Sequence, residues 1–133
     1  MYSHYPLFPP SPSPLSPLSS DFPSLELKIH DDYRDRAAPS VAAQIRLFQG
    51  ARVAIGAHGA GLANCIWMGP GSDVIEFSLA PVQPTSYAVL SAALGLRYWV
   101  VPAIAATQLA HYHITPEGVI SAGETLRAAL TRG

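Results

Sequence analysis

The residues best suited to chemistry lie in one short segment, "GAHGAG" (56–61), where three glycines surround a histidine between two apolar runs. Glycine has no β-carbon, so the backbone here can turn tightly and approach a ligand closely. A helix is expected over 60–67, and the free amides and positive dipole at its start suit an anionic phosphate. His58 can bond a phosphate oxygen or a sugar hydroxyl, or act as an acid or base. The residues of this candidate phosphate site are His58, Gly59, Ala60, Gly61 and Leu62.

The same loop has a plainer interpretation, as a tight strand-to-helix turn whose glycines relieve crowding and whose histidine bonds a backbone carbonyl. Glu76 bears on the choice, because it follows Gly56 by twenty residues near the carboxyl end of the next predicted strand. Acidic side chains at that place in nucleotide-binding units accept hydrogen bonds from ribose hydroxyls. The alternative for Glu76 is an exposed carboxylate at a strand end. The loop and the acid together favour a nucleotide site.

Other chemistries fit the sequence less well. The order Gly-x-x-Gly-x-Gly is not the Gly-x-Gly-x-x-Gly of dinucleotide dehydrogenases, so no redox cofactor is expected. "HGAG" also occurs in oxyanion-hole loops of lipase-like hydrolases, but no serine here lies in a Gly-x-Ser-x-Gly elbow. His111 and His113 have no adjacent carboxylate or cysteine to complete a metal site, and we expect surface residues and no metal. Cys65 is the single cysteine, and we expect a buried thiol.

Strands that alternate with helices must position these residues. Alternating or β-branched runs predict strands, and glycines and capping residues mark the helix ends. The predicted strands are 25–29, 52–56, 73–77, 97–101 and 119–120, and the predicted helices are 40–49, 60–67, 85–94 and 121–130. This order indicates an α/β fold, a Rossmann-like parallel sheet with flanking helices. The loop after 52–56 then lies at the carboxyl edge of the sheet, where ligands bind in such folds.

Three local signals define the helices more closely. Ser40 is a candidate N-cap, and Val41, Ile45 and Phe48 fall on one face of the helix that follows. Gly50 and Gly95 are expected to end the first and third helices. The last helix is expected to begin with a capping box formed by Ser121 and Glu124. Residues 103–115 carry no clear pattern.

The chain as a whole is long enough for one modest core. Residues 1–24 hold seven of the thirteen prolines and are predicted to be an extended or disordered leader, and 25–133 to be a partial Rossmann-like domain. Lys and Arg number eight against nine Asp and Glu, without a basic face, so nucleic acid is not an expected partner. No apolar run of about 18 residues and no secretory signal is visible, so no membrane contact is expected from this chain.

The string from Pro39 to Phe77 resembles the carboxyl-terminal part of glycosyltransferase family 61. That family includes protein O-linked N-acetylglucosaminyltransferases of the endoplasmic reticulum and plant xylosyl- and arabinosyltransferases of the Golgi. The features that carry the resemblance are Gln44, Leu47, Phe48, the His58–Leu62 loop, Asn64, the Gly69–Gly71 turn and Val74–Glu76. The helix from Tyr87, the "LGLRYW" after it and the last helix also resemble the family's tail.

The resemblance implies a two-domain GT-B enzyme, of which this chain is similar to the carboxyl-terminal, donor-binding half. Such an enzyme transfers a sugar with inversion from a nucleotide donor, such as a UDP-sugar, to a hydroxyl of a protein or polysaccharide, without an essential metal or other cofactor. Carried over by position, the amides of Gly59, Ala60 and Gly61 would bind the donor diphosphate. His58 would contact phosphate or sugar, and Glu76 the ribose or base. The resemblance also implies work in the Golgi or endoplasmic reticulum lumen.

The sequence departs from the family where the acceptor domain and an upstream arginine-bearing stretch would be. The catalytic base is expected in that missing part, so no catalytic residue is assigned. We expect that the chain alone does not catalyse transfer, and that a glycan or protein acceptor binds only with the other domain. The alternative is a non-catalytic nucleotide- or phosphate-binding module, or a degenerate interaction module. Uncovered apolar edges would favour self-association.

Overall fold

A computed structural model describes residues 26, 28, 37, 39–78, 86–102, 104–105, 112–113 and 116–131. The predicted leader 1–24 lies outside the described residues, and so do three of the five residues of the predicted strand 25–29. The other two, Glu26 and Lys28, are not part of a strand and form an exposed ion pair, with 3.4 Å between Nζ and Oε1.

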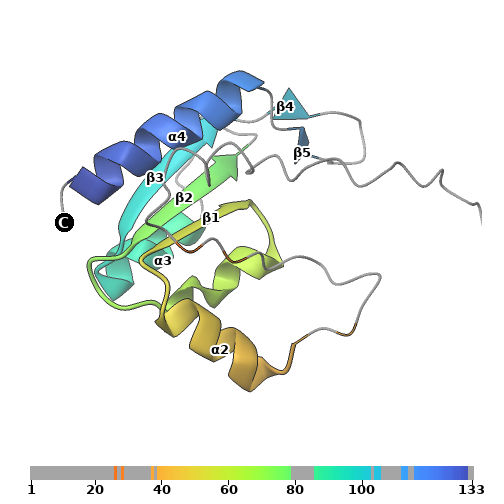
Figure 1. The fold of residues 1–133 in the computed structure, drawn as a ribbon, viewed down its shortest axis with the longest axis vertical. Coiled ribbons are helices and arrows are strands. Elements are labelled where there is room, and N and C mark those ends of the chain that lie inside the picture. The colour runs from red at the N-terminus through yellow and green to blue at the C-terminus, as the bar shows by residue number, and fades with distance from the viewer. Residues whose placement is uncertain are drawn as a thin grey trace, which may run out of the picture.

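Three parallel strands form the centre of the molecule (Figure 1). They are β1 (Val53–Ala57), β2 (Asp73–Ser78) and β3 (Arg97–Pro102), in the order β1-β2-β3. Each lies within one residue of a predicted strand, and the α/β fold class is confirmed. A small antiparallel pair, β4 (Ile104–Ala105) with β5 (Tyr112–His113), follows in the stretch that carried no clear pattern.

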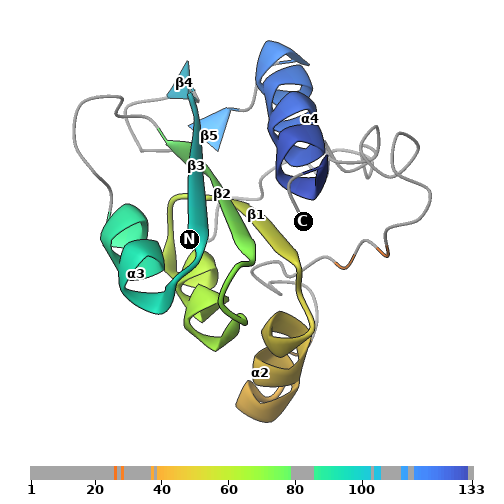
Figure 2. The ribbon, with the colours of Figure 1, turned by 90° about the vertical axis from the view of Figure 1, so that its left-hand side faces the viewer.

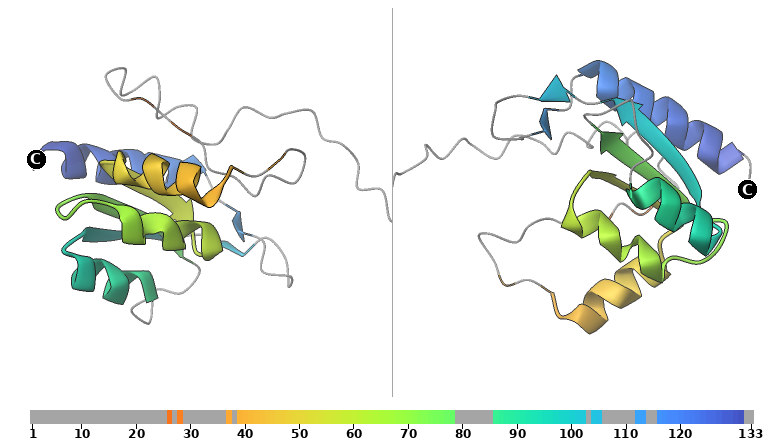
Figure 3. Two further views of the ribbon diagram at one scale, coloured as in Figure 1. Left: turned by 90° about the horizontal axis from the view of Figure 1, so that it is seen from below. Right: turned by 180° about the vertical axis from the view of Figure 1, so that it is seen from behind.

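Helices cover both faces of this sheet (Figure 2). On one face lie α2 (Val41–Gln49), the 3-10 helix η1 (Ala60–Trp67) and α3 (Ser86–Leu94), side by side in that order (Figure 3). On the other face lies α4 (Pro116–Thr131). Layers on both sides explain why the six residues of β2 are all buried.

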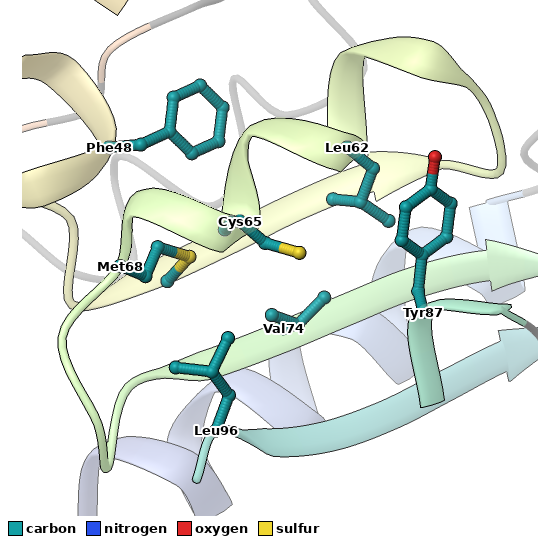
Figure 4. Close-up of a cluster of buried hydrophobic side chains, with 8 residues drawn as sticks. Phe48, Leu62, Cys65, Met68, Val74, Tyr87 and Leu96 are labelled. Atoms are coloured by element: carbon teal, nitrogen blue, oxygen red, sulfur yellow. The ribbon is translucent and has the colours of Figure 1, made fainter. Parts of the chain in front are cut away.

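Two apolar clusters hold these layers together, because successive side chains of a strand point to opposite faces. Figure 4 shows the first, which joins α2, η1 and α3 to the sheet and comprises Phe48, Ala54, Leu62, Cys65, Met68, Val74, Tyr87 and Leu96. The second joins α4 to the sheet and comprises Ile75, Phe77, Val101, Ala122 and Leu126. Glu76 shares its face with Val74 and therefore points toward η1 and α3, not toward α4.

The amino terminus of α2 and the carboxyl terminus of α3 are capped as the sequence predicts. The hydroxyl of Ser40 accepts a hydrogen bond of 3.2 Å from the Ala43 amide, as an N-cap does. Gly95 has φ +68°, and the amide after it donates to the carbonyl of Ser91 at 2.8 Å, which forms a Schellman motif. The predicted apolar face of α2 is only partly right: Phe48 is buried but Val41 is 70% exposed, because the core contacts the last turn of the helix.

The predicted start of the last helix was wrong. α4 begins at Pro116, so the residues predicted as a strand, 119–120, lie inside it and the capping box at Ser121 does not form. The carbonyl of Ser121 instead accepts from the Thr125 hydroxyl at 2.8 Å within the helix. Proline suits the first helical position, and an acidic residue, Glu117, suits the first turn, so a helix start was present in the sequence five residues earlier.

A buried carboxylate fixes the amino edge of the sheet. Asp73 is fully buried and accepts from Arg97 Nε at 2.8 Å and Nη2 at 2.6 Å, and from Trp99 Nε1 at 2.8 Å. The hydrogen bonds that Arg97 donates to the Asp73 carboxylate raise the pKa of Arg97 above its usual value. Arg97 and Arg52 also donate, at 3.4 and 3.5 Å, to the carbonyls of Ala129 and Leu130 at the end of α4. These contacts lie at the edge opposite the glycine loop.

Candidate functional site

The glycine loop leaves the carboxyl end of β1, next to the carboxyl end of β2. Gly56 is paired with Glu76 in the parallel register, and the amide of His58 donates to the carbonyl of Phe77 at 3.0 Å, which extends the pairing by one residue. His58 lies two residues beyond Gly56 and so on the same face of the sheet. The strand register thus places His58 on the same face of the sheet as Glu76, diagonally across from it on the neighbouring strand.

His58, Glu76 and Tyr98 form a hydrogen-bonded chain across the three strands. Nδ1 of His58 lies 2.6 Å from Oε1 of Glu76, and the Tyr98 hydroxyl donates to Oε2 at 2.7 Å. The Glu76 side chain is fully buried, whereas the His58 side chain is 43% exposed. The predicted alternative of an exposed strand-end carboxylate is therefore wrong. The ribose or base contact proposed for Glu76 stays a prediction.

Tyr87 on α3 holds the loop from a third direction. Its hydroxyl donates to the carbonyl of Gly59 at 2.5 Å, and its ring lies edge-on to the imidazole of His58, with 5.3 Å between ring centroids and 61° between planes. The side chain is 9% exposed and belongs to the first apolar cluster, in view in Figure 4. Two hydrogen bonds thus hold the loop in place: the His58 amide donates to the carbonyl of Phe77, and the Tyr87 hydroxyl donates to the carbonyl of Gly59.

The described residues do not crowd Gly56 or Gly59, as the interpretation of the loop as a tight turn would require. Gly59 is extended, with φ 161° and ψ 172°, which any residue adopts, and a β-carbon placed there would have no atom within 4 Å. At Gly56 a β-carbon would be in ordinary contact, 3.5 Å from Leu62. Neither the conformation of Gly59 nor the packing of the described residues requires glycine there, and none of these residues occupies the space beside its backbone.

The amides of the loop provide unused donors. The segment 60–67 is helical, as predicted, though with 3-10 geometry, and its first internal bond runs from the Leu62 amide to the Gly59 carbonyl at 3.1 Å. The amides of Gly59, Ala60 and Gly61 donate to no other described residue. Leu62 itself is 5% exposed and packs in the core, so its contribution here is to hold the helix on the sheet.

Sequence reasoning missed Tyr87 and Tyr98, which complete the site. Both lie far from the loop in sequence, and only the strand register and the docking of α3 bring them to it. Asn64, singled out as a part of the family pattern, donates to the Gly61 carbonyl at 3.2 Å and to Oε1 of Gln44 at 3.5 Å. Its side chain therefore ties the loop helix to α2.

The described residues also bear on metal binding and on membrane insertion. Among the described residues, no group of three or more His, Cys, Asp or Glu side chains lies close enough to hold a metal ion. His113 is in β5, and His111 lies outside the described residues. In the same part of the chain, no helix has both the length and the apolar character that crossing a bilayer requires.

A parallel α/β sheet with a glycine-rich loop at its carboxyl edge defines the Rossmann-like class of domain. Comparison with known families makes this more specific: residues 16–75 match the family model described as Glycosyltransferase 61, which supports membership of that family. The match supports a glycosyltransferase function. It includes the loop and ends one residue before Glu76, and it begins within the segment predicted as a leader. Neither the curated proteins nor the solved structures gave a match.

Proposed function

We propose that the glycine loop binds the diphosphate of a nucleotide-sugar donor, and that the chain is the donor-binding part of an inverting glycosyltransferase. One observation carries the proposal: three amides without an acceptor among the described residues, at Gly59, Ala60 and Gly61, lie beside a half-exposed His58 at the carboxyl edge of a parallel sheet. An anion there would receive hydrogen bonds from amides at the start of η1 together with the positive end of that helix.

Such a site supports sugar transfer by stabilising the leaving group. When an acceptor hydroxyl attacks the anomeric carbon, the bond from that carbon to the phosphate oxygen breaks and negative charge develops on the diphosphate. Donors that already point at this position stabilise that charge without having to reorganise. The loop amides and His58 could therefore do what a divalent cation does in other transferases, and the base that takes the hydroxyl proton would come from outside the described residues.

The finer features of the proposal follow from the family. We infer a GT-B arrangement, in which a second domain carries the acceptor and faces the loop, a UDP-sugar as donor, and a protein or polysaccharide hydroxyl as acceptor in the Golgi or endoplasmic reticulum. The competing function, a non-catalytic module for nucleotides or phosphates, uses the same loop. Transfer of sugar to an acceptor by this chain together with an acceptor domain distinguishes the two, because only the first function requires it.

The test is a calorimetric titration of the protein with UDP. We expect binding by the wild type and at least a tenfold loss in Gly59→Val, because the new side chain would occupy the space beside the amides. Gly69→Val is the matched control: a β-carbon there also has no atom within 4 Å, but the residue lies at the other end of η1. Equal affinity of the two variants, or no UDP binding by well-folded wild type, would overturn the proposal.

A further inference from the structure

Glu76 has the burial and the partners of a residue that acts through another residue. Its carboxylate is fully buried on the central strand, one oxygen bonded to the Tyr98 hydroxyl and the other to Nδ1 of His58. A hydroxyl of a ligand would have to displace one of these partners to reach it. His58, in contrast, is 43% exposed and stands between Glu76 and the space beside the loop.

The hydrogen bond to an ionised Glu76 determines which nitrogen of the His58 ring carries a proton. An ionised carboxylate only accepts hydrogen bonds, so the atom that faces it at 2.6 Å, Nδ1 of His58, carries a proton. The other ring nitrogen, Nε2, has no hydrogen-bond partner among the described residues. In the neutral ring Nε2 is an acceptor, and in the imidazolium it is a donor. Only the imidazolium, with Glu76 as its counter-charge, can donate to a phosphate oxygen through Nε2.

We propose that Glu76 is a positioning residue that fixes the Nδ1-protonated form of His58 and supports its positive charge, so that Nε2 donates to the donor diphosphate. This inference rests on the proposed function and gives Glu76 a role other than ribose binding. Tyr98 holds the carboxylate from the far side, and Tyr87 holds the imidazole edge-on. Neither tyrosine is charged near neutral pH, so Glu76 supplies the negative charge of this cluster.

Two consequences separate this role from a ribose contact. A ligand with phosphate but neither ribose nor base, such as inorganic pyrophosphate, should depend on Glu76 as strongly as UDP does. Binding at a pH where His58 is neutral in the free protein, as the nitrogen-15 shifts of its ring report, should take up a proton as the imidazolium forms. A direct ribose contact predicts neither, because pyrophosphate would not contact Glu76 and the proton on His58 would not matter.

The experiment compares wild type, Glu76→Gln and Tyr98→Phe, each first shown by thermal melting to be folded. We expect Glu76→Gln to weaken UDP and pyrophosphate by the same factor, at least tenfold, and Tyr98→Phe to weaken both by a smaller common factor. Proton uptake is measured at that pH from the calorimetric heats in two buffers of different ionisation enthalpy. We expect uptake by the wild type and its loss in Glu76→Gln. If Glu76→Gln weakens UDP but leaves pyrophosphate unchanged, Glu76 contacts the ribose and the inference is overturned.

A second measurement needs neither a variant nor a ligand. Nitrogen-15 chemical shifts of the His58 ring in the free protein report which ring nitrogen carries the proton in the neutral form. We expect Nδ1, whereas the proton on Nε2 would overturn the inference even if UDP binds. Conversely, an Nδ1 proton without any UDP binding would contradict the proposed function while leaving the pairing of His58 with Glu76 intact. The two failures are therefore distinguishable.

Discussion

Tyr98→Phe and Tyr87→Phe each remove one hydroxyl oxygen from the site, but we expect them to lower the free energy of unfolding by different amounts. Tyr98→Phe removes a donor to the Glu76 carboxylate, which is fully buried, at 2.7 Å. Tyr87→Phe removes a donor to a neutral acceptor, the backbone carbonyl of Gly59, at 2.5 Å. Both changes keep the aromatic ring, so the apolar area buried is almost unchanged and the hydrogen bond dominates the difference.

The expected magnitudes follow from the charge of the acceptor. A hydrogen bond between neutral groups contributes about 0.5–1.5 kcal/mol to the free energy of unfolding, and one to a charged group contributes about 1.5–3 kcal/mol. A buried carboxylate that loses one hydrogen-bond donor is still desolvated, and the free-energy cost of that desolvation is then less well offset. We therefore expect Tyr87→Phe to lower the free energy of unfolding by about 1 kcal/mol and Tyr98→Phe by about 2 kcal/mol.

Urea unfolding followed by tryptophan fluorescence measures both values, provided that the slope against urea concentration is the same in the two variants and the wild type. A Tyr98→Phe variant as stable as Tyr87→Phe, or more stable, would refute the reasoning. Such a result would mean that Glu76 is not a buried carboxylate in need of this donor.

Two further predictions concern the two cores. Burial raises the pKa of the fully buried Cys65 thiol, so a thiol reagent at pH 8 should modify native protein no faster than it unfolds, and the reaction should become rapid in denaturing urea. Phe77, 1% exposed beneath α4, should cost about 3–5 kcal/mol in the free energy of unfolding when replaced by alanine. Val89→Ala, at a residue 65% exposed on α3, should change it by less than about 0.5 kcal/mol in the same urea titration.

The sheet was predictable from the sequence because its signals are local. β-branched runs ended by glycine or polar turns gave the strands to within one residue, and Gly95 and Ser40 gave helix ends with defined geometry. The start of α4 was missed because Val119 and Ile120 look like a strand in isolation, while the helix signal at Pro116 lies outside them. Competing local signals of this kind are decided by packing, here by the face that α4 buries against β2 and β3.

The site was only partly predictable, for a different reason. The sequence identified the loop, His58 and Glu76, since glycine spacing and an acid near a strand end are visible in one dimension. It did not indicate that His58 and Glu76 contact each other, because that depends on the register that pairs Gly56 with Glu76. Tyr98 reaches Glu76 diagonally from β3, two residues before the one paired with it, and no local pattern reports such a contact.

The burial of Glu76 changes how the whole loop is interpreted. An exposed acid at the end of β2 would place negative charge beside the amides of Gly59, Ala60 and Gly61 and would oppose an anion there. A buried acid that is paired with His58 supplies instead the counter-charge of a cation on the ligand side. The carboxylate that would repel a diphosphate if it faced the loop directly can therefore favour its binding through the imidazole.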